Sequence, residues 1–428
     1  MRARLLSLAA PALLTAGLLA PPATPAASAA DGYLNVQLSN TRDGRILVDW
    51  DRAAGSNVTH YVVETATARN MRTDLWRSDR VEPGTTELVV DPSTAVTPAS
   101  GDYTFIKVRV YRSTGTGETP TKWIMPTPVA PPATGPRVGL ASFNVKIWRA
   151  REGQKPWMSW TSRRDHIVST IVGSHAGVVL VQEASGAAKL RVAGKRWQFQ
   201  DLVRRLPDRF RLTDGRLYTH RGDITGSQGS RIIYDTSLYS RVSVGYLKMP
   251  AVSLRGTRWV PWALLRSRTT GEEFYVLSTH FKSGNDKPGS TAVFDLRQRQ
   301  AEFIIDQTAP LAATGRSVFV GGDFNSTSNT RPHNGVHRTM VLAGYSDGFA
   351  SRDITNGEYP TTTHGFSFPV RPGAYRRDYL MGLNTPGGSY SFVNHVNQSE
   401  SSAASDHFMQ SAVLPVRPGP YGAARSAG

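Results

Sequence analysis

The stretch Val318-Phe319-Val320-Gly321-Gly322-Asp323-Phe324-Asn325 decides how the rest of this sequence is interpreted. Its apolar start predicts a strand buried on both faces, and two glycines end that run. Residues i and i+2 of an extended segment face the same side, so we expect Asp323 and Asn325 to face one spot together. Such a pair suits a site that positions water or a phosphate oxygen. A polar turn at a strand end has the same composition, so the motif alone leaves both interpretations open.

The first 30 residues have the pattern of a secretory signal peptide. A basic start, Met1-Arg2-Ala3-Arg4, is followed by an apolar run over 5–19 and by small residues up to Ala30. The apolar run contains Pro11 and is too short to span a bilayer comfortably. We expect cleavage after Ala29 or Ala30, a secreted, extracellular protein without a transmembrane segment, and a monomer.

Composition limits the chemistry and divides the chain. Cysteine is absent from the 428 residues, which excludes Cys-based zinc sites and thiol catalysis. Residues 31–130 hold 11 Lys and Arg against 12 Asp and Glu, whereas residues 131–428 hold 37 against 21. The balance is therefore −1 in the first part and +16 in the second. A cationic domain favours polyanionic partners.

The near-neutral part predicts a small all-β domain. Short strand-like runs at 46–50, 60–65, 86–90 and 103–111 are separated by turn residues, which is typical of an antiparallel β-sandwich. A Trp-bearing strand, a Tyr-Val-Val strand and a Tyr-started strand in this order resemble a fibronectin type III domain over 31–125. We interpret it as a spacer, or as a module that contacts a cell surface or polymer. The proline-rich stretch 126–136 predicts a semi-rigid linker.

In the basic part, polar side chains repeatedly follow or open apolar strand-like runs. One helix is predicted over 163–172 from the spacing of its apolar residues. The polar residues that share this placement at a strand end are Asn144, Glu183, His280, Asp323, Asn325, Asp378, Asp406 and His407. Asp406 and His407 need an irregular turn to face one site, because neighbours in a regular strand point to opposite faces.

This ordered set resembles the endonuclease/exonuclease/phosphatase superfamily, of which the deoxyribonuclease I-like nucleases are the best-known type. The motifs that carry the resemblance are Ser142-Phe143-Asn144, Gln182-Glu183, Thr279-His280, Gly322-Asp323-Phe324-Asn325, Arg377-Asp378-Tyr379 and Ser405-Asp406-His407. They cover roughly 137–415, so we set the catalytic domain at 137–418 with a flexible tail at 419–428. The resemblance implies an α/β four-layer sandwich of two mixed sheets with helices outside.

The expected chemistry is metal-dependent phosphodiester hydrolysis. Glu183, with Asn144 and Asp406 nearby, offers only oxygen ligands, which suit Mg²⁺ or Mn²⁺. The resemblance implies that Asp378 orients His407 as a base or transition-state histidine.

The resemblance also implies that Asp323 and Asn325 hold the attacking water or a phosphate oxygen. His280 would bind phosphate or protonate the leaving oxygen, with Asp223 offered as its acidic partner. Tyr218 and Arg231 are predicted phosphate contacts; a core aromatic and a surface cation are the alternatives.

Three functions stay open at this point. The first is a secreted nuclease acting on DNA and on RNA. The second is a phospholipid headgroup phosphodiesterase of the sphingomyelinase C type, or an inositol-phosphate phosphatase, with Trp157, Trp160, Trp259 and Trp262 as candidates for an apolar rim. The third is a cell-surface binding protein with an inactive second domain; the intact set of polar strand-end residues argues against it.

Overall fold

The structure, a computed structural model, describes part of the chain. The described residues are 34–41, 43–91, 103–126, 131–148, 158–185, 196–215, 229–251, 258–284, 291–327, 335–357, 359–370, 376–397 and 399–419. The predicted signal peptide and most of the predicted tail lie outside them, as do Trp157, Tyr218 and Asp223.

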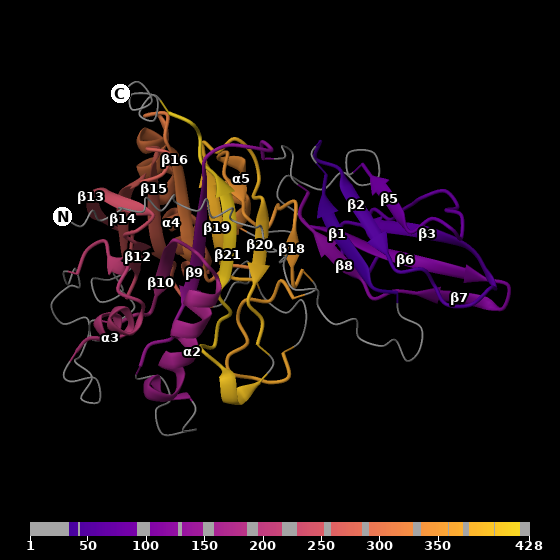
Figure 1. Cartoon of the computed structure of the whole chain (residues 1–428), viewed down its shortest axis with the longest axis horizontal. Helices are drawn as coiled ribbons and strands as arrows, with labels where there is room; N and C mark the ends of the chain where they lie inside the picture. Colours follow the sequence, from indigo (N-terminus) through magenta and orange to yellow (C-terminus); the bar gives the residue numbers. More distant parts are fainter. Residues whose placement is uncertain are drawn as a thin grey trace, which may run out of the picture.

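Eight strands near the N-terminus form a unit of their own, drawn in indigo and purple in Figure 1. They are β1 (Val36–Asn40), β2 (Ile46–Trp50), β3 (Val58–Ala66), β4 (Trp76–Arg77), β5 (Glu87–Val90), β6 (Thr104–Arg112), β7 (Gly115–Glu118) and β8 (Lys122–Ile124). One sheet has the order β1-β2-β5 and the other β4-β3-β6-β7, with β8 paired to β6. Trp50 and Tyr61 meet edge to face between them. The strands lie where the sequence predicts them; the fibronectin likeness stays a prediction.

The larger unit contains two mixed sheets. The first has the order β11-β12-β10-β9-β21-β20-β18 and the second the order β13-β14-β15-β16-β19-β17. The first sheet consists of β9 (Arg137–Asn144), β10 (Val178–Gln182), β11 (Phe210–Leu212), β12 (Arg231–Asp235), β18 (Ile354–Thr355), β20 (Ser391–Asn394) and β21 (Gln410–Pro415). The second consists of β13 (Tyr239–Lys248), β14 (Trp259–Ser267), β15 (Glu273–His280), β16 (Ser317–Asp323), β17 (Ser346–Asp347) and β19 (Asp378–Leu383).

The helices cover the outer faces of these sheets, so the layers run helices, sheet, sheet, helices. They are α2 (Trp160–Gly173), α3 (Gln198–Arg205), α4 (Thr291–Ala312), α5 (Gly335–Leu342) and a short 3₁₀ turn at Glu400–Ser402. Apolar side chains of α2 and α3 pack with those of β9, β10 and β12, and those of α4 and α5 pack with β15, β16 and β19. A third cluster fills the space between the sheets. No described helix has the length and apolar character needed to cross a bilayer.

The central strands are apolar without alternation because both of their faces are covered. Every residue of β10 and of β16 is buried. In α2, Ile167 and Ile171 are buried on the stripe that the sequence predicts, and Ser159 caps the helix by accepting a hydrogen bond from the amide of Ser162.

The two glycines of β16 are required by close packing. A Cβ on Gly321 would lie 2.7 Å from Cδ1 of Leu180 in the facing sheet, and one on Gly322 would lie 1.9 Å from the carbonyl oxygen of Thr279 on β15. Any side chain at either position would push β16 away from its neighbours. The glycines therefore set how close Asp323 comes to the other sheet.

The N-terminal unit packs against the larger unit, while its role as a spacer or contact module stays a prediction. Tyr103 packs edge to face on Phe349 with 5.4 Å between the ring centroids, and Trp123 and Met125 join the apolar cluster between the large sheets. Asn40 Nδ2 donates hydrogen bonds to the carbonyl oxygens of Met125 and Ser351. Figure 1 shows β1 and β8 beside β18 at this contact. The alternating apolar residues of 103–111 predict a strand with one buried face, but this pattern does not indicate which part of the chain covers that face.

This contact predicts that the two units stabilise each other against unfolding. Tyr103→Ala should lower the free energy of unfolding by about 3–5 kcal/mol, the usual cost of removing a buried aromatic ring. The measurement is urea unfolding of the full chain. Tyr111→Ala is the matched control, because Tyr111 lies on β6, the strand that directly follows Tyr103, but stacks on His60 within the N-terminal unit. An unchanged Tyr103→Ala midpoint would show that the two units unfold independently.

Candidate active site

Three candidate residues lie at the same level of the second sheet. In the strand register His280 of β15 pairs with Asp323 of β16, and Asp323 pairs with Asp378 of β19. Parallel β15 and β16 end at this level and antiparallel β19 begins there. Directly opposite residues face the same side of a sheet, so strand pairing brings these three side chains together.

The first sheet places its own polar residues at the same end. Parallel β9 and β10 pair Asn144 with Gln182, and Glu183 follows directly. Asp406 and His407 precede β21 in an irregular segment, in which His407 forms a single bridge with Thr363. The structure therefore brings the predicted residues of both sheets to one edge.

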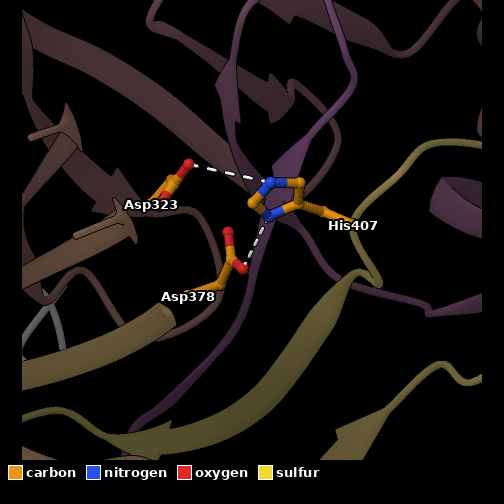
Figure 2. Close-up of side chains that lie close together, drawn as sticks. All are labelled: Asp323, Asp378 and His407. Atoms are coloured by element: carbon orange, nitrogen blue, oxygen red, sulfur yellow. Dashed lines mark hydrogen bonds and ion pairs between the residues drawn. The ribbon is translucent and has the colours of Figure 1, made fainter. Parts of the chain in front are cut away.

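Direct contacts join the two sets across the interface between the sheets. Asn144 Nδ2 donates to Asp323 Oδ2 at 3.1 Å. His407 Nδ1 lies 2.8 Å from Asp378 Oδ2, and its Nε2 lies 3.8 Å from Asp323 Oδ2. Figure 2 shows the ring between the two carboxylates. His280 Nε2 approaches the same Asp323 oxygen at 3.4 Å. Two histidines and one amide thus converge on one carboxylate.

Left-handed backbone follows three of the strands that end at the site. Lys146, Glu183 and Asn325 have φ angles of 55°, 58° and 50°. Such a conformation costs a non-glycine residue about 1–3 kcal/mol and persists where surrounding contacts enforce it. At Glu183 those contacts are hydrogen bonds from the amide of Ile147 at 2.9 Å and from Asn144 Nδ2 at 3.2 Å.

The side chains of Asn325 and Asp323 do not face the same point, as they would in a regular strand. Its backbone amide donates to Asp323 Oδ1 at 2.8 Å, and its side-chain Nδ2 donates to the carbonyl oxygen of Phe281 at 3.0 Å. The left-handed turn breaks the strand after Asp323 and removes the i, i+2 relation. Asn325 consequently fixes Asp323 and the segment after His280.

Burial and neighbouring charges give the two histidines opposite properties. Burial lowers the pKa of His280 well below its ordinary value, and the cations Arg258, His407, Lys146 and Lys282 lower it further. Burial also disfavours charge on His407, but the carboxylates of Asp378, Asp323 and Asp406 outweigh it and raise its pKa to about 10. His280 is therefore neutral and His407 carries a proton at neutral pH.

The surroundings also shift the pKa values of Asp323 and Asp406 in opposite directions. Burial and the nearby Asp378 raise the pKa of Asp323, against the opposing effect of His407 and the amides that bond it. Burial would raise the pKa of Asp406 too, but the charges of His407 and Lys146 outweigh it and lower the value. Asp323 thus accepts a proton more readily than Asp406, which stays ionised.

Arg231 is buried, which excludes the alternative of a surface cation. The side chain is 1% exposed and its guanidinium carbon lies 4.3 Å from the ring centroid of Phe199 on α3. It packs on α3 and lies opposite Val181 of β10, two residues before Glu183, and its contact with phosphate stays a prediction. Tyr218 and Asp223 lie outside the described residues, and buried Nδ1 of His280 has no hydrogen-bond partner among the residues that the structure describes.

Sequence reasoning missed residues that support the site. Thr362 Oγ1 accepts hydrogen bonds from the amides of Arg377 and Asp378 at 2.9 and 3.1 Å, which fixes the start of β19. Ser405 Oγ donates to the carbonyl oxygen of Asn144 at 2.6 Å. Ser405 belongs to a recognised motif, whereas Thr362 lies among threonines with no distinguishing pattern. Lys146, which contacts Asp406, belongs to none of the recognised motifs.

Two groups could hold a divalent cation, and the first fits poorly. Ligand atoms of Asp323, Asp378 and His407 lie within 4.8 Å of one another. However, His407 Nδ1 is engaged by Asp378, and its raised pKa keeps both ring nitrogens protonated. A protonated imidazole has no lone pair to offer a metal.

The oxygen set of Glu183 and Asp406 beside Asn144 fits better. Lys146 Nζ lies 2.7 Å from Asp406 Oδ2, so a positive charge is already attracted to this carboxylate. The side chain of Asp406 is 11% exposed, and Glu183 is partly open to solvent. Oxygen donors with solvent access suit Mg²⁺ or Mn²⁺, which keep several bound waters.

Comparison with known proteins agrees with this geometry. Residues 152–407 match the endonuclease/exonuclease/phosphatase family. The chain belongs to this family. Its members are divalent-metal-dependent hydrolases of phosphoester bonds. The matched range contains every candidate residue except Asn144, which lies on β9 just before it. No curated protein matches the chain.

Solved structures show the same fold at low identity. A family protein from Bacteroides vulgatus has a TM-score of 0.51 and 20% identity, covering 66% of this chain and 100% of its own. One from Bacteroides thetaiotaomicron has a TM-score of 0.50 and 15% identity, covering 67% and 99%. A mannosyl-6-phosphatase from B. thetaiotaomicron VPI-5482 has a TM-score of 0.49 and 16% identity, covering 65% and 99%. The likeness extends over the family unit, and the substrate has to be argued from this chain.

The Asp378–His407 pair predicts a pH dependence of stability in the metal-free protein. The folded state raises the pKa of His407 from 6.5 to about 10, so it holds this proton more tightly than the unfolded chain. The contribution to stability is then present below about pH 6.5 and is lost as the pH rises toward about 10. Asp378→Asn should flatten this loss, as measured by urea unfolding at pH 7 and pH 9.

Asp306→Asn is the control for that experiment, because it removes the same charge from an exposed position on α4. It should leave the wild-type slope in place. If Asp378→Asn and wild type lost stability equally over this range, Asp378 would not hold the proton on His407.

Proposed function

We propose that the chain is an exported phosphodiesterase that requires Mg²⁺ or Mn²⁺ and hydrolyses nucleic acid, with DNA as the main substrate and RNA as a further one. The observation that carries the proposal is the convergence on Asp323. A neutral histidine, a protonated histidine and an amide approach one buried carboxylate oxygen beside an oxygen-rich cation site. Phosphodiester hydrolysis needs an activated water, neutralisation of phosphate charge and support for the leaving oxygen.

Asp323 is the group placed to take a proton from the attacking water. Asn144 and the amide of Asn325 orient the carboxylate, and its raised pKa suits a proton acceptor. His407 is held by Asp378 with its protonated Nε2 toward the same space. It stabilises the negative charge that develops on the phosphate oxygens. Of its two expected roles, the base is disfavoured because its proton is held too tightly.

His280 contributes a neutral hydrogen bond to phosphate. Its lowered pKa disfavours the alternative in which it protonates the leaving oxygen. Glu183 and Asp406 would hold the metal, whose chemistry is to neutralise phosphate oxygens and support the leaving group. The positive charges of Arg258, Lys146 and Lys282 lower the pKa of His280, so these cations lie near the site. Such surroundings favour an anionic substrate.

Charge favours nucleic acid among the possible phosphodiesters. The excess of +16 over residues 131–428 lies in the unit that carries the site, and a polymer with a phosphate at every step rewards it. The described tryptophans favour no lipid rim. Trp160 lies on α2 and is buried, where its Nε1 donates to Asp201 of α3, whereas Trp259 and Trp262 lie on β14 and contact Tyr246 and Tyr275 of the second sheet. Trp160 is therefore separated from the other two by the pair of sheets.

A substrate panel tests this function. Purified protein is assayed on duplex DNA, RNA, sphingomyelin and inositol phosphates, each with Mg²⁺ and with excess chelator. We expect DNA cleavage that chelator abolishes, and a fall in kcat of about 10²–10⁴-fold in His407→Ala. Arg268→Lys is the control, because Arg268 is exposed after β14, at the end of the sheet opposite the site, where it donates to the carbonyl oxygen of Thr236. Hydrolysis of sphingomyelin without any nucleic acid cleavage, or full activity in chelator, would contradict the proposal.

A further inference from the structure

Lys146 makes the closest cation contact in the candidate site. It follows β9 by two residues, and its Nζ lies 2.7 Å from Asp406 Oδ2, while its side chain remains 25% exposed. The two residues come from distant parts of the sequence. The ammonium group therefore bridges two segments of the site and still reaches solvent.

The backbone under this side chain is fixed. Its amide donates to Asn144 Oδ1 at 3.1 Å, and its carbonyl oxygen accepts from Gln198 Nε2 at 2.8 Å and from Arg163 at 3.3 Å. These bonds enforce the left-handed φ of 55°. The backbone of Lys146 is therefore fixed in position, and only its flexible side chain can move.

The ammonium group faces the carboxylates that the oxygen set assigns to the divalent cation. Burial disfavours its charge and Arg163 opposes it, but the attraction of Asp406 and Glu183 outweighs both. A cation of charge +2 at these oxygens would compete with the ammonium for Asp406 and repel it at short range. The ammonium group of Lys146 and a metal ion cannot both bind the carboxylate of Asp406 at close range.

We propose that Lys146 is a resident cation of the site, which holds Asp406 until a divalent ion takes its place and is then free to bind the substrate phosphate. This inference rests on the proposed function for the identity of the metal ligands. Without a cation, Glu183 and Asp406 would repel each other beside the negative charge of the second sheet. With the lysine the site stays assembled before the metal arrives, and its release adds a positive charge for an anionic substrate.

The test measures metal binding directly. Binding of Mn²⁺ to the full chain is followed by the electron paramagnetic resonance of the free ion, so no activity enters the readout. Lys146→Met removes the competing charge and keeps the stem, and it should bind Mn²⁺ about tenfold more tightly than wild type. Lys146→Arg keeps the charge and should bind much as wild type does.

Two controls separate competition from a general change of charge. Lys282→Met removes one positive charge after β15 on the other sheet and should tighten Mn²⁺ binding far less. In an Asp406→Asn background, adding Lys146→Met should change the affinity less than it does in wild type, because the contact is already weakened. At saturating Mn²⁺, inorganic phosphate should bind more weakly to Lys146→Met than to wild type.

Unchanged or weaker Mn²⁺ binding by Lys146→Met would overturn the inference, and so would equal tightening in Lys282→Met. Failure of the proposed function gives a different result. In that case wild type hydrolyses no nucleic acid, while Lys146→Met still binds Mn²⁺ more tightly. If neither wild type nor Lys146→Met binds Mn²⁺, both proposals fail. Circular dichroism melting of each variant shows that it is folded under the assay conditions.

Discussion

The close approach of β16 to the facing sheet is the constraint on which the site depends. Gly321 and Gly322 leave no room for a side chain, so the end of β16 lies against both β15 and the opposite layer. This allows the hydrogen bond of 3.1 Å between Asn144 and Asp323, which come from different sheets. A site assembled from two packed sheets is rigid, because moving one group would require the sheets to separate.

The same packing explains the electrostatics. Burying several ionisable groups is costly unless each is paired or hydrogen-bonded. Here Asp378 pairs with His407, Asp406 with Lys146, and Asp323 is bonded by two amides. The pairing leaves His280 neutral and His407 charged within reach of one carboxylate. The charge state of each residue, and with it the role of that residue, therefore depends on the partner that it contacts at the edge of the sheets.

Much of this arrangement could be predicted from the sequence, since apolar runs mark the central strands and polar residues mark their ends. The left-handed turn at Glu183 could not be predicted, because glutamate rarely adopts this conformation, whereas the composition around Asn325 was compatible with a turn and left the choice open. The burial of Arg231 could not be predicted, because a strand-start arginine is usually exposed, whereas this one is covered by Phe199. The ion pair of Lys146 with Asp406 and the contact of Tyr103 with Phe349 join distant parts of the chain, and local patterns carry no information on such pairings.

The central claim is that one edge of the two sheets separates a cation site at Glu183 and Asp406 from a proton-transfer group around Asp323. Anomalous diffraction from crystals grown with Mn²⁺ tests it most directly. The account predicts an anomalous peak within about 2.2 Å of carboxylate oxygens of Glu183 and Asp406. In that structure His407 should remain bonded to Asp378. A manganese ion held by Asp323, Asp378 and His407 instead would contradict the account.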